Sequence, residues 1–331
     1  MTIEQSYYEP LVYLVPESDA GMKLGNVLKN RMGISRTLMT RMKQTEQGIT
    51  VNGARTYTDA VVQAGDRVEA RMRKEESEDI LPEPMELAIL HEDDHLLILN
   101  KPPGAIVHPT HGHYTGTLAN GVVWHWQQNG ELVRFRPVHR LDQETSGVLA
   151  IAKNPFVHQH ISEQMQRGTV DKEYRAIVRG RLEAAEGTVD APIARDADNP
   201  RVRIVTPEGD RAVTHFRTEE AHEEGTVVQI RLETGRTHQI RVHMRHLGHP
   251  LYGDKMYGVG GEAETGIIPG REEALLEPSF DEEREGIARQ ALHAEKLAFV
   301  HPGTGERMTF TAPLPLDMQH LIERLRGPSR S

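Results

Sequence analysis

Two short stretches near the start of the chain place apolar residues at helical spacing, every three or four positions. They are residues 22–28 and residues 35–42, and the second begins at Ser35, a residue type that caps helices. Strand patterns follow: residues 48–53 close in an Asn-Gly turn, and residues 65–70 predict the strand that returns. The pattern therefore predicts a compact module, helices first and strands after them.

Beyond Leu87 the pattern changes to short apolar runs, which are typical of strands. Residues 87–90 and 96–99 flank an acidic turn and predict a hairpin. Residues 213–218 and 226–232 predict a second antiparallel pair. Few strand-helix-strand units are visible. The fold class we expect is α+β, with a mixed, largely antiparallel sheet on which helices pack.

Composition limits the chemistry. The chain has 331 residues, 37% of them hydrophobic, which suits one large domain plus a small one. No stretch approaches the roughly 18 consecutive apolar residues of a membrane span, and residues 1–19 lack the basic and apolar blocks of a secretory signal. We expect a cytoplasmic protein that does not enter a membrane. The absence of Cys excludes disulfides, thiol nucleophiles and Cys-based metal sites.

Charge is segregated along the chain, which changes the meaning of its net charge of −10. Residues 20–74 carry 11 Lys and Arg against 4 Asp and Glu, whereas residues 75–86 hold six acids and no Lys or Arg. Residues 258–289 hold nine acids against three Arg. We expect a small basic domain, a linker over residues 75–86, and a large domain over residues 87–325 with an acidic insertion at 258–289. A basic face can bind nucleic acid or can merely be solvated.

The clearest chemical signal is the stretch His139-Arg140-Leu141-Asp142-Gln143-Glu144-Thr145-Ser146-Gly147. The carboxylate of Asp142 lies between a basic pair and a Thr-Ser-Gly turn, and an apolar strand follows. Such a place can hold one carboxylate rigidly beside cations. The stretch therefore indicates a nucleophilic Asp. A buried charge of this kind is costly unless a cation pairs with it.

Five further segments complete a pattern that resembles the RNA pseudouridine synthases of the RluA-like type. They are Asn100-Lys101-Pro102-Pro103-Gly104, Lys172-Glu173-Tyr174-Arg175-Ala176, Gly235-Arg236-Thr237-His238-Gln239-Ile240-Arg241-Val242-His243, Ala291-Leu292-His293-Ala294 and Ala312-Pro313-Leu314-Pro315. The resemblance covers nearly all of residues 87–318. It implies the fold of that family and its reaction, in which the bond between uracil N1 and ribose breaks and the base rejoins through C5. No atom is gained or lost, so no cofactor or metal is implied.

The same resemblance implies a catalytic trio. Asp142 is the nucleophile, Arg241 forms a salt bridge with it, and Tyr174 contacts the target uridine. Residues 170–178 alternate as a strand, which places Tyr174 on one face with Lys172 and Ala176. Whether Tyr174 acts as a base or only as a stacking platform stays open.

Arg241 is expected on a short helix. Thr237 is the predicted N-cap, Ile240, Met244 and Leu247 form the predicted apolar stripe, and Gly248 ends the helix. Arg241 lies off that stripe in this pattern. A surface Arg on an amphipathic helix is the alternative.

Other residues complete the expected substrate site. Arg140 is implied to fill the gap that an everted base leaves in the RNA. Lys101 is expected to touch an RNA phosphate or to shape the pocket wall, and Lys172 accompanies Tyr174. His139 and Thr145 are expected to hold the loop that carries Asp142.

The basic module over residues 20–74 resembles the ribosomal-protein-S-four-like RNA-binding domain. The resemblance implies that its helices present basic side chains to RNA phosphates, and Arg36, Arg41 and Lys43 on the second helix are the candidates. With this module in front, the chain resembles most the synthases that modify large-subunit ribosomal RNA. We expect ribosomal RNA as the partner of a monomeric enzyme.

Alternatives remain at this stage. A transfer-RNA synthase, or a catalytically silent RNA-binding assembly factor, would share much of the pattern. Ser146 suggests a serine hydrolase, but no Gly-x-Ser-x-Gly surrounds it. The run of His238, His243, His246 and His249 suggests a metal site, but the nearby arginines would repel a cation.

Overall fold

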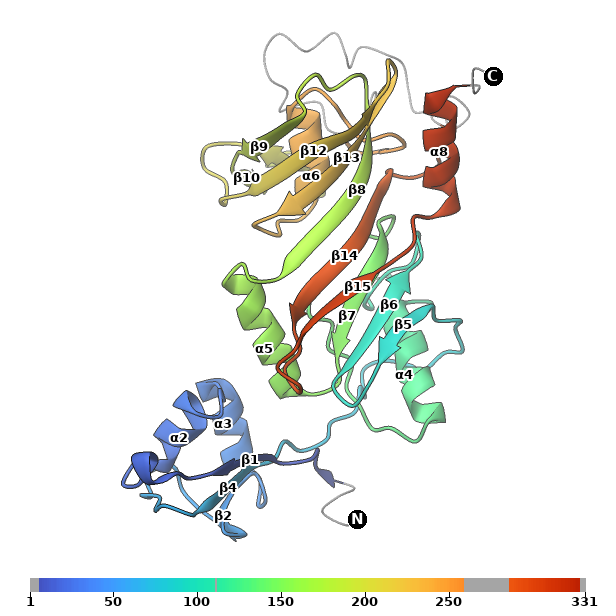
Figure 1. Cartoon of the computed structure of the whole chain (residues 1–331). Coiled ribbons are helices and arrows are strands. Elements are labelled where there is room, and N and C mark those ends of the chain that lie inside the picture. Colours follow the sequence, from blue (N-terminus) through green and yellow to red (C-terminus); the bar gives the residue numbers. More distant parts are fainter. Residues whose placement is uncertain (1–5, 111, 259–285, 328–331) are drawn as a thin grey trace.

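Two bodies of secondary structure follow each other along the chain (Figure 1). The structure, a computed structural model, describes residues 6–110, 112–258 and 286–327. The small first body has a sheet of order β1-β4-β2-β3 with two helices. Its elements are β1 (Leu11–Leu14), η1 (Glu17–Asp19), α2 (Leu24–Asn30), α3 (Arg36–Lys43), β2 (Ile49–Val51), β3 (Ala54–Arg55) and β4 (Arg67–Ala70).

This small body confirms the two helices and differs from the prediction in its strands. Ser35 caps α3 by accepting a hydrogen bond from the backbone N–H of Leu38 at 3.2 Å. The Asn52-Gly53 turn leads into β3, and β4 pairs with the other side of β2. Strand β1 lies before residue 20 and pairs antiparallel with β4, so the sheet takes in residues outside the predicted module. The arrangement is consistent with a ribosomal-protein-S-four-like domain.

Residues 75–86 do more than separate the two bodies. The segment was expected to be a linker, and two of its residues, Ser77 and Ile80, are buried. Ile80 packs in the core beside helix α4, and Ser77 accepts a hydrogen bond from the N–H of Phe135 at 2.8 Å. The segment is therefore anchored to the large body.

The large body is built on a sheet of nine strands in the described part of the chain. Its order is β5-β6-β7-β14-β8-β13-β12-β9, and β15 also pairs with β14. β7 and β14 are parallel, whereas the other neighbours are antiparallel, which confirms the mixed, largely antiparallel sheet. The elements are β5 (Ile89–Glu92), β6 (Leu96–Lys101), α4 (Leu118–Gln128), β7 (Ser146–Ala152), α5 (Pro155–Gln166), β8 (Asp171–Arg179), β9 (Glu186–Asp190), β10 (Ile193–Arg195), β11 (Arg203–Val205), β12 (Val213–Ala221), β13 (Gly225–Leu232), α6 (Gln239–His246), β14 (Leu292–Val300), β15 (Arg307–Thr311) and α8 (Leu316–Arg326).

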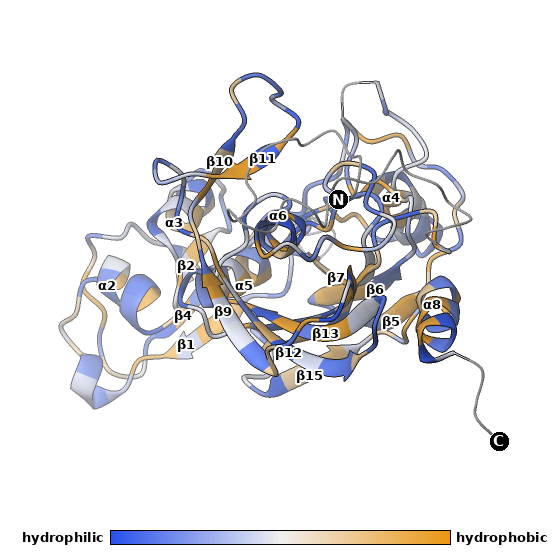
Figure 2. Ribbon diagram, turned by 90° about the horizontal axis from the view of Figure 1, so that it is seen from above, coloured by the Kyte–Doolittle hydropathy of each residue, from blue (hydrophilic) through white to orange (hydrophobic). Residues whose placement is uncertain are grey.

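Helices cover both faces of this sheet, which explains its strongly apolar central strands. Leu97 and Leu99 pack with α4, whereas Leu96 and Ile98 point the other way and pack with α5. Helix α6 lies in the hollow of the curved sheet, and the β10–β11 hairpin projects beyond it (Figure 2). Helix α8 packs on the opposite face, around Ile177. Helices α4 and α6 therefore lie on the same face of the sheet. The candidate site lies between the chain segments that carry these two helices.

The acidic insertion predicted at residues 258–289 lies largely outside the described residues, which resume at Gly286. Arg289, at its end, is buried and belongs to the body of the protein. In the ranges that the structure describes, no helix is long and apolar enough to cross a membrane.

Candidate active site

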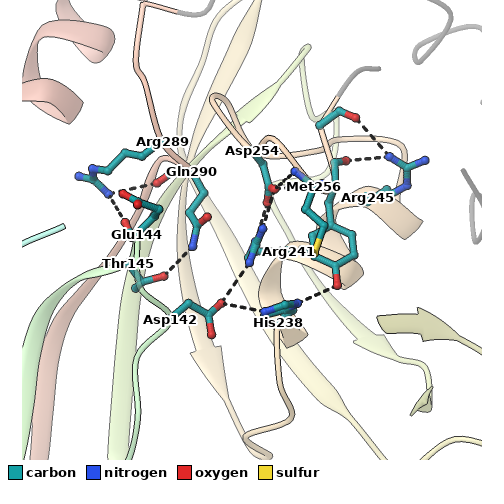
Figure 3. Close-up of polar contacts among 12 residues, drawn as sticks. Asp142, Glu144, Thr145, His238, Arg241, Arg245, Asp254, Met256, Arg289 and Gln290 are labelled. Carbon is teal, nitrogen blue, oxygen red and sulfur yellow. Dashed lines mark hydrogen bonds and ion pairs between the residues drawn. The ribbon is translucent and has the colours of Figure 1, made fainter. Parts of the chain in front are cut away.

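The loop that carries Asp142 is tied down at several points before β7 begins. Its turn closes with a hydrogen bond from the N–H of Thr145 to the carbonyl of Asp142 at 3.0 Å. Lys101 Nζ donates to the carbonyl of Gln143 at 2.7 Å, and Arg289 Nη1 donates to the carbonyl of Glu144 at 3.0 Å. Gln290 Nε2 donates to the hydroxyl of Thr145 at 3.1 Å. The loop around Asp142 is therefore held by Lys101, Arg289 and Gln290, and Figure 3 shows the bonds of the last two.

Of the two roles expected for Lys101, contact with an RNA phosphate or shaping of the pocket wall, the first does not fit its side chain, which is fully buried. The ammonium lies beneath the loop and bonds the carbonyls of Pro102 and Gln143. Burial lowers the pKa of Lys101 to about 7. A neutral amine still has two N–H donors, one for each of these carbonyls, so the loop keeps both bonds when the proton is lost.

Arg241 lies between two carboxylates. Its Nε and Nη2 donate to Asp254 at 2.7 and 2.8 Å, and its Nη1 lies 3.4 Å from Asp142 Oδ2. Asp254 is completely buried, whereas the side chain of Asp142 is 25% exposed and faces the cleft. The guanidinium therefore reaches Asp142 from a bidentate anchor on Asp254 (Figure 3).

The charges of this pair stabilise each other inside the protein. Burial alone would lower the pKa of Arg241, but the charges of Asp254 and Asp142 raise it above its usual value. Burial alone would raise the pKa of Asp254, but Arg241 and the N–H groups of Met256 and Tyr257 hold it below its ordinary value. The aromatic ring of Tyr257 lies 4.8 Å from the guanidinium carbon. Both groups are thus charged at neutral pH.

The predicted helix around Arg241 is confirmed, but its start and its surface are not as expected. The N-cap is His238, not Thr237, and His238 has a left-handed backbone with φ 59° and ψ 15°. Gly248 ends the helix with φ 81°. Every residue from Gln239 to Arg245 is buried, so α6 is not amphipathic at the surface, and Arg241 is an interior residue. The reason is that the helix is enclosed between the sheet and the segment after it.

Two cavities share part of their lining around Asp142. A cleft of about 900 Å³ opens on one side, and a narrower pocket of about 90 Å³ lies on the other. Five residues line both, namely Arg140, Leu141, Asp142, His238 and Arg241. Tyr174 lines the narrow pocket and is nearly buried. Asp142 therefore borders both cavities, whereas Tyr174 borders only the narrow pocket.

A model of the family described as "RNA pseudouridylate synthase" matches residues 95–246, which contain Asp142, Tyr174 and Arg241. The uncharacterized RNA pseudouridine synthase YjbO of Bacillus subtilis is 42% identical over 88% of this chain and 95% of its own. The chain belongs to the RNA pseudouridine synthases. It is an isomerase.

Other comparisons agree with this family. The ribosomal large subunit pseudouridine synthase D of Neisseria meningitidis is 37% identical and covers 94% of this chain and 81% of its own. A solved structure titled "Human RNA Pseudouridylate Synthase Domain Containing 4" superposes with a TM-score of 0.57 at 25% identity, over 72% of this chain and 93% of that one. The pseudouridine synthase fold expected from the motifs is thereby confirmed.

The other residues predicted for the site of this synthase differ in how far they are buried. Arg140 is exposed at the mouth of the cleft. His139 is half-buried behind the loop, and its Nε2 accepts a hydrogen bond from the N–H of Ala150 at 3.1 Å. Burial, and next the charge of Lys172, lower the pKa of His139 to about 4. Lys172 itself is half-buried on the strand of Tyr174, and burial lowers its pKa.

Ser146 and His243, from the patterns that suggested the two alternative chemistries, are buried and bonded to structural partners in the described part of the chain. Ser146 and His293 form a hydrogen bond of 2.9 Å, but both are buried, and His293 Nε2 lies against the carbonyl of Ala312. This pair is structural. His243 is buried between Thr214 and the carbonyl of Ala191, and the described ranges contain no cluster of three His or acidic residues that could hold a metal.

Sequence reasoning missed several residues of the synthase site. Asp254, His238, Tyr257, Arg289 and Gln290 all contact the residues that it found. Two of them had a local signal: His238 lies inside the motif stretch that contains Arg241, and Asp254 belongs to the Gly-Asp pair that follows α6. Tyr257, Arg289 and Gln290 are joined to the site by contacts between distant segments.

Proposed function

We propose that Asp142 is the nucleophile of this synthase and that its substrate is a uridine in large-subunit ribosomal RNA. The observation that carries the first part is the place of Asp142, in the lining that the two cavities share and opposite the anchored guanidinium of Arg241. A carboxylate can attack the ribose or the uracil ring and leave again, which the isomerisation requires. The ion pair with Arg241 holds the carboxylate of Asp142 in one orientation and leaves it free to react.

Tyr174 is better suited to stack against the target base than to remove a proton as a general base. Burial, and next the charge of Asp142, raise the pKa of its hydroxyl above the ordinary value. The phenol therefore keeps its proton at neutral pH and can donate a hydrogen bond. Its ring borders the narrow pocket, where a base that leaves the RNA stack could pack against it.

Arg140 is suited to fill the space that the everted base leaves in the RNA stack. It is exposed, it lines both cavities, and it lies two residues before Asp142. A planar guanidinium can stack among bases and also bind phosphates, which offsets the few kcal/mol of stacking that base eversion costs.

The choice of ribosomal RNA rests on the relatives and on the basic module. Several relatives, including those of Neisseria meningitidis and Pseudomonas aeruginosa, are named ribosomal large subunit pseudouridine synthase D. We propose the division into a small RNA-binding domain, residues 20–74 together with β1, a linker, and the catalytic domain over residues 87–325. Arg36, Arg41 and Lys43 are exposed on one helix of the small domain, as phosphate contacts would need.

The nucleophile is tested by Asp142→Asn, which preserves shape and removes the charge. We expect isomerisation to fall by at least about 10⁴-fold while RNA affinity stays within a few fold, because the variant loses the attacking group only. Exposed Asp59→Asn is the matched control and should be fully active. Pseudouridine formed by Asp142→Asn at the wild-type rate would reject the assignment.

The substrate is tested by mapping pseudouridine in ribosomal and transfer RNA from cells with and without the gene. We expect positions in large-subunit ribosomal RNA to revert to uridine. Loss confined to transfer RNA would instead identify the alternative substrate, with the same chemistry.

RNA binding by the small domain is tested with Arg36→Gln and Lys43→Gln together. If each cation contacts a phosphate, the slope of log Kd against log salt should fall by roughly 0.7 to 0.9 for each, because fewer counterions are released. The control removes two cations elsewhere, Arg307 and Arg326, and should leave the slope unchanged. An equal change in both double variants would show that the effect is one of net charge.

A further inference from the structure

The backbone of His238 adopts the left-handed conformation, which is unusual for a residue with a side chain. His238 is one of two non-glycine residues with positive φ in the described part of the chain, and the other, Asn52, lies in a hairpin turn. A left-handed residue with a side chain costs about 1 kcal/mol or more. Here the strain falls at the N-cap of α6, where no side-chain cap is formed. The conformation directs the imidazole toward Asp142, and this suggests that the direction matters (Figure 3).

The imidazole lies where a bound nucleotide would lie. His238 lines both the cleft and the narrow pocket, and its side chain is 17% exposed. Its Nε2 is 3.9 Å from Asp142 Oδ2, which is too long for a hydrogen bond between them. An atom placed on the cleft side of this gap would be near both groups.

The other ring nitrogen determines which tautomer is present. Nδ1 lies 2.8 Å from the hydroxyl of Tyr257, and that oxygen also accepts a hydrogen bond from the N–H of Arg203 at 2.8 Å. Tyr257 is 1% exposed. Since its oxygen already accepts, the hydroxyl proton is satisfied by donation to Nδ1. His238 then carries its proton on Nε2, so a donor faces the cleft.

We propose that His238 donates this Nε2–H to a carbonyl oxygen of the target uracil, and so stabilises the charge that the base acquires as its bond to ribose breaks. The C1′–N1 bond breaks with its electron pair remaining on the uracil, where O2 and O4 share the negative charge. A donor aimed at one of these oxygens binds the departing base more strongly than the intact nucleotide. This role rests on the proposed nucleophile: in the attack on the ribose, the carboxylate of Asp142 forms a bond to C1′ as the C1′–N1 bond breaks, and the electron pair of that bond leaves with the uracil.

The neutral state of the imidazole suits this part. Burial lowers the pKa of His238, and the charge of Asp142 opposes that effect only in part. A neutral ring offers its N–H without forming a full ion pair with the nucleophile. The nucleophile keeps its contact with Arg241, and the donor stays available to the base.

The test compares His238→Gly with His238→Gln in the full chain. Gly removes the donor and relieves the left-handed strain, so the protein should stay folded, whereas Gln replaces the ring with an amide N–H of similar reach. In single-turnover assays, on whichever transcript of ribosomal or transfer RNA the wild type modifies, we expect His238→Gly to lose about 10²-fold in rate. RNA affinity should stay within about threefold, and His238→Gln should recover at least tenfold of the loss.

Two further variants test the donor role of His238. Tyr257→Phe leaves the imidazole in place but frees its tautomer, and we expect a loss of about tenfold in rate with RNA affinity unchanged. A rate for His238→Gly within threefold of wild type, or a His238→Gln as slow as His238→Gly, would overturn the donor role. Asp142→Asn is run beside them. If Asp142→Asn is active, the nucleophile is wrong, whereas an inactive Asp142→Asn beside an unimpaired His238→Gly rejects the donor alone.

Discussion

At the scale of single residues, the site depends on charged side chains that the protein interior has stripped of water. Arg241 and Asp254 tolerate burial because each is the partner of the other, and breaking such a pair typically costs about 3–5 kcal/mol. Lys101 is different, since its partners are carbonyls and not a carboxylate. Burial therefore lowers the pKa of Lys101, and the ammonium loses its proton more easily.

Lys101 makes the stability of the protein depend on pH in a specific window. Burial lowers its pKa from 10.5 to about 7, so between these values the unfolded chain binds a proton that the folded chain does not. Stability should therefore rise with pH across this window, by up to about 1.4 kcal/mol per pH unit. Lys101→Met should lose this rise. The measurement is urea unfolding at pH 7 and pH 9, with exposed Lys29→Met as the control, and parallel curves for wild type and Lys101→Met would contradict it.

At the scale of elements, the loop of Asp142 is positioned by the contact between two parallel strands. β7 and β14 meet at Gly147 and Ala294, directly after the loop. Gly147 has φ 115°, and a Cβ there would lie 2.1 Å from the carbonyl oxygen of Ala294. Only Gly allows the two backbones to approach so closely. The start of β7, and with it the reach of Asp142, is fixed by this contact.

Gly147→Ala should therefore be strongly destabilising. We expect a loss of at least about 3 kcal/mol, because backbone strain and a clash with backbone add up, and the rate of isomerisation should fall as the loop shifts. Gly104→Ala is the matched control: it also has positive φ, 81°, but nothing lies within 4 Å of its Cβ position. It should lose about 1 kcal/mol. Equal losses in chemical denaturation would show that the contact with β14 has no energetic weight.

At the scale of the whole molecule, the small body is docked on helix α5 of the large one. Phe156 of α5 packs within the core cluster of the small body. Gln159 accepts a hydrogen bond from the N–H of Ser35 at 3.0 Å and donates one to the carbonyl of Gly33 at 2.8 Å. Tyr8 donates to the carbonyl of Lys153 at 2.7 Å. These contacts hold helix α3 at a defined distance from the cleft.

Gln159→Ala should loosen this docking without damaging the catalytic body. It leaves a backbone N–H and a carbonyl without their partner, at a cost of about 1–3 kcal/mol. We expect faster proteolytic cleavage in residues 75–86, a separate unfolding transition for the small body, and unchanged turnover of a short RNA that reaches only the cleft. Gln164→Ala is the control, because Gln164 lies on the same helix but bonds Val300 of the large body. Identical proteolysis of the two variants would contradict the docking.

Much of this protein was predictable from local sequence. Alternation and turns predicted the strands that pair as β5 with β6 and β12 with β13, because the period of a strand is recorded in neighbouring residues. The motif stretches predicted the family, and they named Asp142, Tyr174 and Arg241 as candidates for its site. The small strand β1 was missed because four residues in an acidic segment carry too little pattern.

What only the tertiary structure decided is which groups lose their water and which partners they find. Asp142 and Arg241 are 99 positions apart, and Gln290 reaches Thr145 across 145. The burial of Lys101, the anchoring of Arg241 by Asp254 and the left-handed turn that aims His238 all follow from how distant segments pack. The sequence by itself determined the chemical types and the local periods. Desolvation and partner choice depend on contacts across the whole chain, and these set the charges and the directions of the groups at the site.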